Sequence, residues 1–236
     1  MTEVTLLTAV FYGFLLGVKH ALDADHVLAI TTIVSRNRSL LRSVLAGVSW
    51  GVGHTFTLFA VGLAVLVFKL AIPDKLALSM EFIVGVILVL LGLSVIGRLV
   101  TRRVHLHRHP HDAASHSHDE APGHDHRYLG RPLLIGMVHG LAGSGALTVL
   151  VLSVMPSVGQ GLFFLLVFGA GSILGMLVFS GLIGLPFRFT TQVSHRLNLW
   201  LQGVAGVASI AFGLFMMWEI GFTGGLFVAW ALAAQA

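Results

Sequence analysis

Four ionisable residues, His20, Asp23, Asp25 and His26, lie close together inside a long apolar stretch that covers residues 4–34. Imidazole nitrogens and carboxylate oxygens suit first-row divalent metal ions such as nickel, cobalt and zinc. Ionisable side chains at membrane depth are costly and normally occur only in a pathway, a relay or a binding site. The pattern therefore predicts a transition-metal site inside a bilayer.

The spacing of these residues predicts how they share the site. On one continuous helix, about 100° per residue places His20, Asp23 and His26 on a common face of about 120°. Asp25 then projects elsewhere, and it either orients a histidine from behind or joins the site through a local break in the helix. Carboxylates commonly hold metal-bound imidazoles in this way, because they fix the ring tautomer.

Two further histidines are candidate metal donors. His54 lies between glycines in the next apolar stretch, where the alternative is a packing role. His139 occupies the position in the second half of the chain that corresponds to His20 in the first. Ser144 and Gly145 stand there in place of Asp25 and His26, so we expect an asymmetric site.

Composition places the chain in the membrane. Of its 236 residues 56% are hydrophobic and 10% charged, against about 25% charged residues in soluble proteins, and the mean hydropathy is +0.92. The absence of cysteine excludes disulfides, iron–sulfur clusters and thiolate metal sites. The basic residues lie beside apolar stretches, which favours contact with lipid and no nucleic-acid partner.

Six apolar stretches are long enough to cross a bilayer, which takes about 20 residues each. They are residues 4–34, 44–70, 78–100, 132–155, 161–185 and 199–220. The expected fold is therefore an all-α integral membrane protein with six transmembrane helices. Arginine is concentrated after the first, third and fifth stretches, which predicts a multi-pass plasma-membrane protein with these connections in the cytoplasm and both termini outside.

The two halves of the chain resemble one another at an offset of about 119 residues, with glycines recurring in each pair of stretches. Each half has an odd number of spans, so the copies must cross the membrane in opposite senses. The sequence thus predicts two inverted three-helix repeats, residues 1–100 and 132–236, with a site between them near the midplane.

Residues 101–131 separate the repeats and show no apolar periodicity. We expect a disordered cytoplasmic loop that captures metal, since His-rich tracts commonly bind it. Its histidines are His105, His107, His109, His111, His116, His118, His124 and His126.

The string Lys19-His-Ala-Leu-Asp-Ala-Asp-His26 resembles the His-x4-Asp-His signature of the nickel/cobalt transporter family, and Gly-His54-Thr looks like a further family element. The chain is similar to the short six-helix branch of that family, although Gly140–Gly145 replaces the further acidic motifs of longer members. The resemblance implies uptake of Ni²⁺ or Co²⁺ by a secondary permease, which is not an enzyme and needs no cofactor beyond the transported ion.

The same resemblance implies metallochaperones or nickel-enzyme maturation proteins as cytoplasmic partners. Three alternatives stay open from the residues alone. Nickel/cobalt efflux proteins also have six helices and a His-rich loop, and a sensor or accessory protein would bind metal without moving it. An intramembrane metallohydrolase is disfavoured, because the chain has no His-Glu-x-x-His string.

Overall fold

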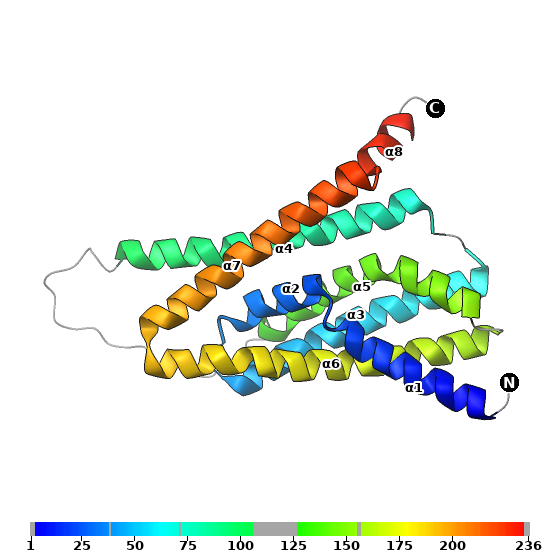
Figure 1. The fold of residues 1–236 in the computed structure, drawn as a ribbon, viewed down its shortest axis with the longest axis horizontal. Coiled ribbons are helices and arrows are strands. Elements are labelled where there is room, and N and C mark those ends of the chain that lie inside the picture. Colours follow the sequence, from blue (N-terminus) through cyan, green and yellow to red (C-terminus); the bar gives the residue numbers. More distant parts are fainter. Residues whose placement is uncertain (1–2, 38, 71, 106–126, 155–156, 234–236) are drawn as a thin grey trace, which may run out of the picture.

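The structure is a computed structural model that describes residues 3–37, 39–70, 72–105, 127–154 and 157–233 (Figure 1). The described residues form helices and connections and contain no strand. The helices are α1 (Glu3–His20), α2 (Ala24–Val34), α3 (Leu40–Phe68), α4 (Asp74–His105), α5 (Arg127–Val154), α6 (Val158–Val193), α7 (His195–Trp218), the π-helical turn η1 (Glu219–Thr223) and α8 (Leu226–Ala233).

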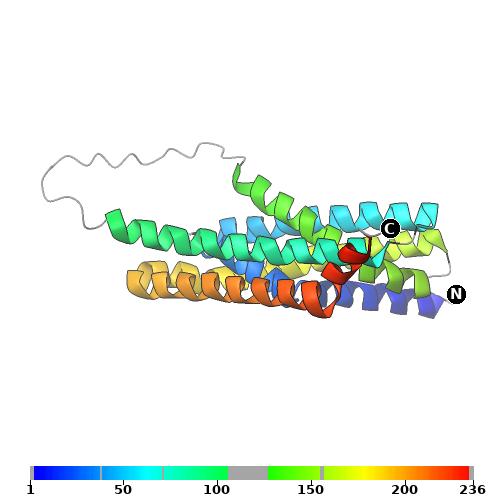
Figure 2. The ribbon, with the colours of Figure 1, turned by 90° about the horizontal axis from the view of Figure 1, so that it is seen from above.

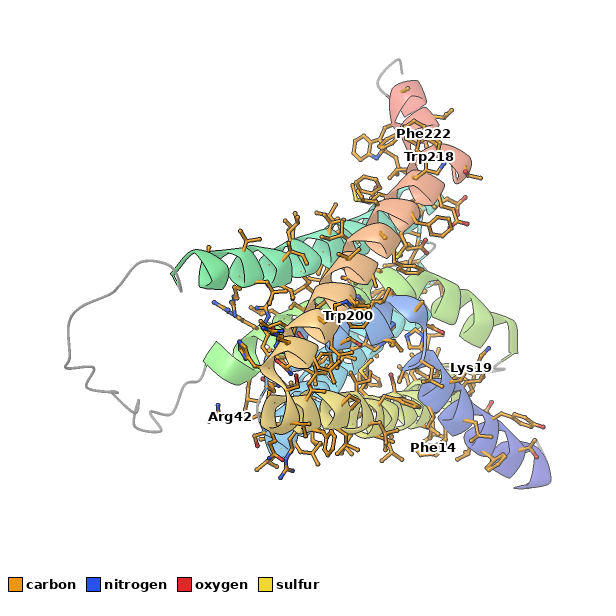
Figure 3. The ribbon with its side chains drawn as sticks, turned by 60° about the vertical axis from the view of Figure 1, so that its left-hand side comes forward. Phe14, Lys19, Arg42, Trp200, Trp218 and Phe222 are labelled. Carbon is orange, nitrogen blue, oxygen red and sulfur yellow. The ribbon has the colours of Figure 1, made fainter. Side chains whose placement is uncertain are left out.

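Four of the described helical segments are long and apolar enough to cross a membrane: Leu40–Phe68, Asp74–Thr101, Val158–Val193 and His195–Thr223. Large apolar side chains project from the outside of these helices, as Trp200 and Trp218 do on α7 (Figure 3). The prediction of an all-α integral membrane protein is confirmed. The two other predicted spans fall on α1 with α2 and on α5, and the count of six stays a prediction.

The first apolar stretch is not one continuous helix, and this corrects the expected common face of His20, Asp23 and His26. Helix α1 ends at His20, a tight turn follows, and α2 begins at Ala24. In the turn the Asp23 amide donates to the His20 carbonyl at 3.0 Å, and the Val27 amide donates to the Asp23 carbonyl. Aspartate favours the position just before a helix, because its side chain competes for backbone hydrogen bonds inside one.

The expected loop at residues 101–131 is also too wide. Helix α4 continues to His105, and α5 already begins at Arg127, so both edges of this segment are helical. The histidines from His107 to His126 lie outside the described residues. The orientation of this segment in the membrane stays a prediction.

The helices form two packed groups with α2 between them. Helices α1, α3, α5 and α6 pack together, and α4 packs along α7 (Figures 1 and 2). The short helix α2 contacts α3, α4, α6 and α7. It therefore links the two groups and carries Asp25 and His26 into the space between them.

Close helix contacts are made where glycine, which has no Cβ, lets a neighbouring helix approach, as is common in membranes. The contacts that show helix direction are Gly13–Phe164 and Gly17–Phe168 (α1 with α6), Trp50–Gly136 and His54–Gly140 (α3 with α5), Gly47–Ser180 and Gly62–Leu165 (α3 with α6), and Gly85–Gly213 and Gly92–Gly206 (α4 with α7). Residue numbers rise together in the first two helix pairs, which are parallel. They run oppositely in the last two, which are antiparallel.

Candidate metal centre

Three histidines from three helices meet between the packed groups. His20 ends α1, His26 lies in the first turn of α2, and His54 lies in the middle of α3. One ligand atom from each ring lies within 4.8 Å of the others. His26 and His54 are buried, and His20 is partly open. The turn between α1 and α2 brings His20 and His26 together, with ring centroids 4.6 Å apart.

Each histidine of the motif is held by a neighbouring carboxylate. Asp23 Oδ2 accepts a hydrogen bond from His20 Nδ1 at 2.7 Å, and Asp25 Oδ1 accepts one from His26 Nδ1 at 3.0 Å. A proton on Nδ1 leaves the lone pair of a neutral imidazole on Nε2, which is the atom free to bind a metal. Asp23 and Asp25 thus orient the rings from behind, and His20, His26 and His54 present the candidate ligand atoms.

The histidine pair His20 and His54 is hydrogen-bonded, with 3.1 Å between the two Nε2 atoms. Since the His20 proton is on Nδ1, the His54 Nε2 atom donates in this pair, and the His54 Nδ1 atom carries a lone pair. A cation that binds His20 Nε2 must break this hydrogen bond. His54 must then rotate or change its tautomer to take the same ion.

Several ring nitrogens at this site are buried and have no hydrogen-bond partner among the residues that the structure describes. They are His26 Nε2, His54 Nδ1 and His139 Nε2. A buried polar atom without a partner costs about 1–3 kcal/mol. Coordination of a divalent cation removes this cost for a neutral imidazole nitrogen, so the unpartnered atoms fit metal binding.

His139 lies beside the three-histidine group and not in it. Its Nδ1 atom donates to the Ile135 carbonyl at 3.2 Å, and its Nε2 atom is 4.0 Å from Asp25 Oδ2. The His139 and His26 rings are 5.3 Å apart. Asp25 therefore stands close to both histidines, and His139 is placed to influence the centre through that carboxylate.

The centre has aromatic neighbours that the sequence analysis did not single out. The indole ring of Trp50 stacks on His26 with an interplanar angle of 23° and meets His139 edge-on at 5.0 Å. Phe168 approaches the ring of His20. Trp50 precedes His54 by one helical turn on α3, and this spacing was the available signal. These rings cover part of the histidine group.

Glu81 is a second residue that the sequence analysis missed. It lies in α4, is half-buried and is near enough to Asp25 for electrostatic interaction. An acidic side chain in the apolar stretch of residues 78–100 was the signal for it. Glu81 adds a third carboxylate to the surroundings of the histidine group.

One comparison with known proteins gives a family of membrane proteins. Residues 27–215 match the family described as "Cytochrome C biogenesis protein transmembrane region". The urease accessory protein UreH of Bacillus sp. (strain TB-90) is 42% identical over 98% of this chain and 99% of its own length. No solved structure gives a significant match.

More distant relatives occur in a plant. The chloroplast proteins "FOR GROWTH AND FERTILITY" 1 and 2 of Arabidopsis thaliana are each 27% identical to the chain, over 88% and 90% of it. The match spans only 58% and 56% of their own lengths. From the matched region and the near full-length similarity to UreH, the chain belongs to the cytochrome C biogenesis protein transmembrane region family and to the same family as the urease accessory protein UreH.

Proposed function

We propose that the protein carries Ni²⁺, or Co²⁺, across the membrane into the cell through the His20, His26 and His54 centre. The observation that carries this proposal is the meeting of three imidazoles between two helix groups, with two of the rings oriented by carboxylates. Imidazole suits nickel, cobalt and zinc, and the chain offers no thiolate. Urease is a nickel enzyme, so similarity to a urease accessory protein favours nickel.

The proposed path needs no ATP. The ion exchanges its water for the imidazoles, while Asp23, Asp25 and Glu81 offset its charge. Two positive charges that move inward gain about 4.6 kcal/mol per 100 mV of membrane potential. A negative-inside potential therefore drives uptake and opposes efflux.

The inverted-repeat arrangement belongs to this proposal, and the helix contacts support it. An offset of about 119 residues carries Gly17 onto Gly136 and Phe168 close to Trp50. The contact Gly17–Phe168 then corresponds to Gly136–Trp50, and both contacts are present. Exchange of the halves thus reproduces contacts between them, as a two-fold relation requires.

Helix directions support the same relation. Helix α1 runs parallel to α6, α6 runs antiparallel to α3, and α3 runs parallel to α5. It follows that α1 and its counterpart α5 run in opposite senses. In inverted-repeat transporters the rocking of one part against another opens a central site to each side in turn, and here α2 lies between the parts that would move.

A second candidate function is metal binding without transport. The word "accessory" in the name of the Bacillus relative favours it. In that case the centre would hold the ion for nickel-enzyme maturation proteins. These are the proposed partners for both candidate functions. The His-rich segment around His107 to His126 would then be a store or a hand-over site.

A flux measurement separates these functions. The purified chain is placed in lipid vesicles with an inside-negative potassium diffusion potential, and Ni²⁺, Co²⁺ or Zn²⁺ is added outside. We expect accumulation of Ni²⁺ or Co²⁺ that rises with the potential and disappears when the potential is collapsed. Binding by the detergent-solubilised chain with no accumulation in vesicles would favour the accessory function and contradict transport.

The two orienting carboxylates predict graded losses. Loss of a carboxylate behind a metal-bound histidine typically weakens metal affinity about 10–100-fold. We expect the loss of nickel affinity in Asp25→Asn to lie at the upper end of this range, because Asp25 is more buried and stands near both His26 and His139. The loss of affinity in Asp23→Asn should lie at the lower end, because the Asp23 side chain is half exposed.

Calorimetric titration of the solubilised variants with nickel measures these affinities. Unchanged affinity in both variants would contradict the orienting role. Complete loss of binding in Asp25→Asn, as large as that in His26→Ala, would place the Asp25 oxygen on the ion itself.

A further inference from the structure

A cluster of arginines stands away from the metal centre, at the end of α2. Arg36 follows α2, Arg42 lies in the first turn of α3, Arg98 lies in α4 and Arg131 in α5. Arg42 is the labelled member of this cluster in Figure 3. Three of these four arginines, Arg36, Arg98 and Arg131, interact electrostatically as like charges. Like charges this close together favour the binding of an anion beside Arg36, Arg98 and Arg131.

Two adjoining cavities open at this cluster. One has a volume of about 510 Å³ and the other about 660 Å³, and Arg36, Asn37 and Arg98 line both. Arg42 and Arg131 complete the second cavity. Among the described residues, no acidic side chain lines either cavity. Within the described part of the chain, the walls therefore offer hydrogen-bond donors and positive charge, with no lining carboxylate beside Arg36, Arg98 or Arg131.

Donor atoms in these walls lack partners among the described residues. Arg36 donates from Nη2 to Ser94 Oγ, but its buried Nε atom has no hydrogen-bond partner. Asn37 is 8% exposed, and its Nδ2 atom is also without a partner. Burial and the neighbouring Arg98 and Arg131 guanidinium groups lower the pKa of Arg36 to about 10. In the part of the chain that the structure describes, no carboxylate pairs with Arg36, Arg98 or Arg131.

The second cavity also has an apolar wall. Ile87, Leu90 and Leu91 of α4 face Pro132 and Ile135 of α5 across it. Leu90 is 59% exposed, so this wall reaches the lipid-facing surface of α4. A free anion gains nothing from such a wall, whereas acyl chains do.

We propose that Arg36, Asn37, Arg98 and Arg131 form a site for the phosphate group of an anionic phospholipid. Guanidinium groups bind phosphate oxygens through paired, charge-assisted hydrogen bonds. Basic pockets between membrane helices are known to hold anionic head groups. The unpartnered Nε of Arg36 and Nδ2 of Asn37 supply further donors, and the apolar wall receives the chains.

Such a lipid would join the end of α2 to α4 and α5. Arg36 is ten residues beyond His26, which corresponds to about 15 Å along the chain if it were helical throughout. The bound lipid would therefore hold in place the helix that carries Asp25 and His26. This site does not depend on the proposed metal transport, and it is tested without metal.

The test uses the full chain, purified and delipidated in a neutral detergent. Thermal unfolding is measured with dioctanoyl phosphatidylglycerol, with dioctanoyl phosphatidylcholine and with inorganic phosphate at equal concentrations. Arg98→Gln and Arg131→Gln are compared with Arg188→Gln, an exposed arginine of α6 that lines neither cavity. Native mass spectrometry counts the lipids that stay bound.

We expect phosphatidylglycerol to raise the unfolding temperature, with one retained lipid per chain, and phosphatidylcholine to do so far less. Each of the two cavity variants should bind phosphatidylglycerol about fivefold more weakly, as expected for one cation near an anionic head group. Arg188→Gln should bind normally. Equal effects of the two lipids, or an equal loss in Arg188→Gln, would overturn the proposal. Stabilisation by inorganic phosphate with none added by lipid would overturn the lipid assignment and make free phosphate the ligand.

Discussion

Replacement of His54 by alanine is expected to abolish nickel uptake while the chain stays folded in the membrane. The three-histidine group has one ligand from each of α1, α2 and α3. Loss of the α3 ligand leaves only the pair at the α1–α2 turn, and the ion loses its link to α3. We expect nickel affinity to fall by more than the factor of about 10–100 typical of an orienting residue. His20→Ala and His26→Ala should behave in the same way.

His139→Ala is the matched control for this experiment. His139 is buried as deeply as His54, carries the same side chain and lies on the adjacent helix α5, but it is outside the three-histidine group. Both substitutions leave a cavity of the same size, so both should lower the unfolding temperature by similar amounts. Only His54→Ala should remove uptake. Equal losses of uptake in the two variants would show that burial, and not ligation, explains the effect.

Nickel-63 accumulation in vesicles and calorimetric nickel binding in detergent give the two readouts. Size-exclusion elution and the unfolding temperature check that each variant is folded. Uptake by His54→Ala near that of the unchanged chain would remove His54 from the centre and overturn the three-histidine assignment.

The sequence was most informative where ionisable side chains occur inside an apolar stretch, because the bilayer disfavours charge there. His20, Asp23, Asp25 and His26 stood out because charge is costly in an apolar stretch. The same cost applied to Glu81, but a single acid in a long apolar stretch carries no spacing pattern. Trp50 gave no signal of its own type, because aromatic residues are common in membrane helices. Its position one helical turn before His54 was the available signal, but only the fold shows that the indole ring also stacks on His26.

The turn at residues 21–23 shows why the details of the site could not be predicted. An apolar stretch of this length fits a single span, and the periodicity does not distinguish one helix from two in line. Asp23 before an apolar run is also a helix-start signal, but its carboxylate bonds to His20 and not to the α2 backbone. The same His20 ring also bonds His54 of α3, a residue that lies far away in sequence.

The predicted boundaries of the loop at residues 101–131 were wrong for a different reason. Arg102, Arg103 and Arg127 flank a polar segment, and polarity alone does not show where a helix ends. Arginine is a good helix former, so α4 and α5 extend beyond their apolar parts. The recurring glycines, which led to the expected repeat, lie at positions of close helix contact, such as Gly85 and Gly206. They did not show which glycines meet, because that requires the direction of each helix.

Gly140→Ala is expected to disturb the centre from the neighbouring helix. A Cβ atom at Gly140 would overlap the backbone carbonyl of His54, a contact that no side-chain rotation relieves. Helices α3 and α5 must then move apart, and His54 moves with α3. Overpacking of this kind costs about 1–3 kcal/mol. We expect a lower unfolding temperature and a loss of nickel affinity together.

Gly143→Ala provides the control three residues further along α5. A Cβ atom there would meet only the His20 ring, 3.8 Å from its Cε1 atom, which is an ordinary van der Waals contact. The same chemical change should therefore leave stability nearly unchanged, and nickel affinity should fall less than in Gly140→Ala, because His54 is not displaced. The test compares the unfolding temperatures and the nickel affinities of the two variants. If Gly140→Ala bound nickel as well as Gly143→Ala, the close packing of α5 on α3 would not set the position of His54, and the centre would be held by the α1–α2 turn alone.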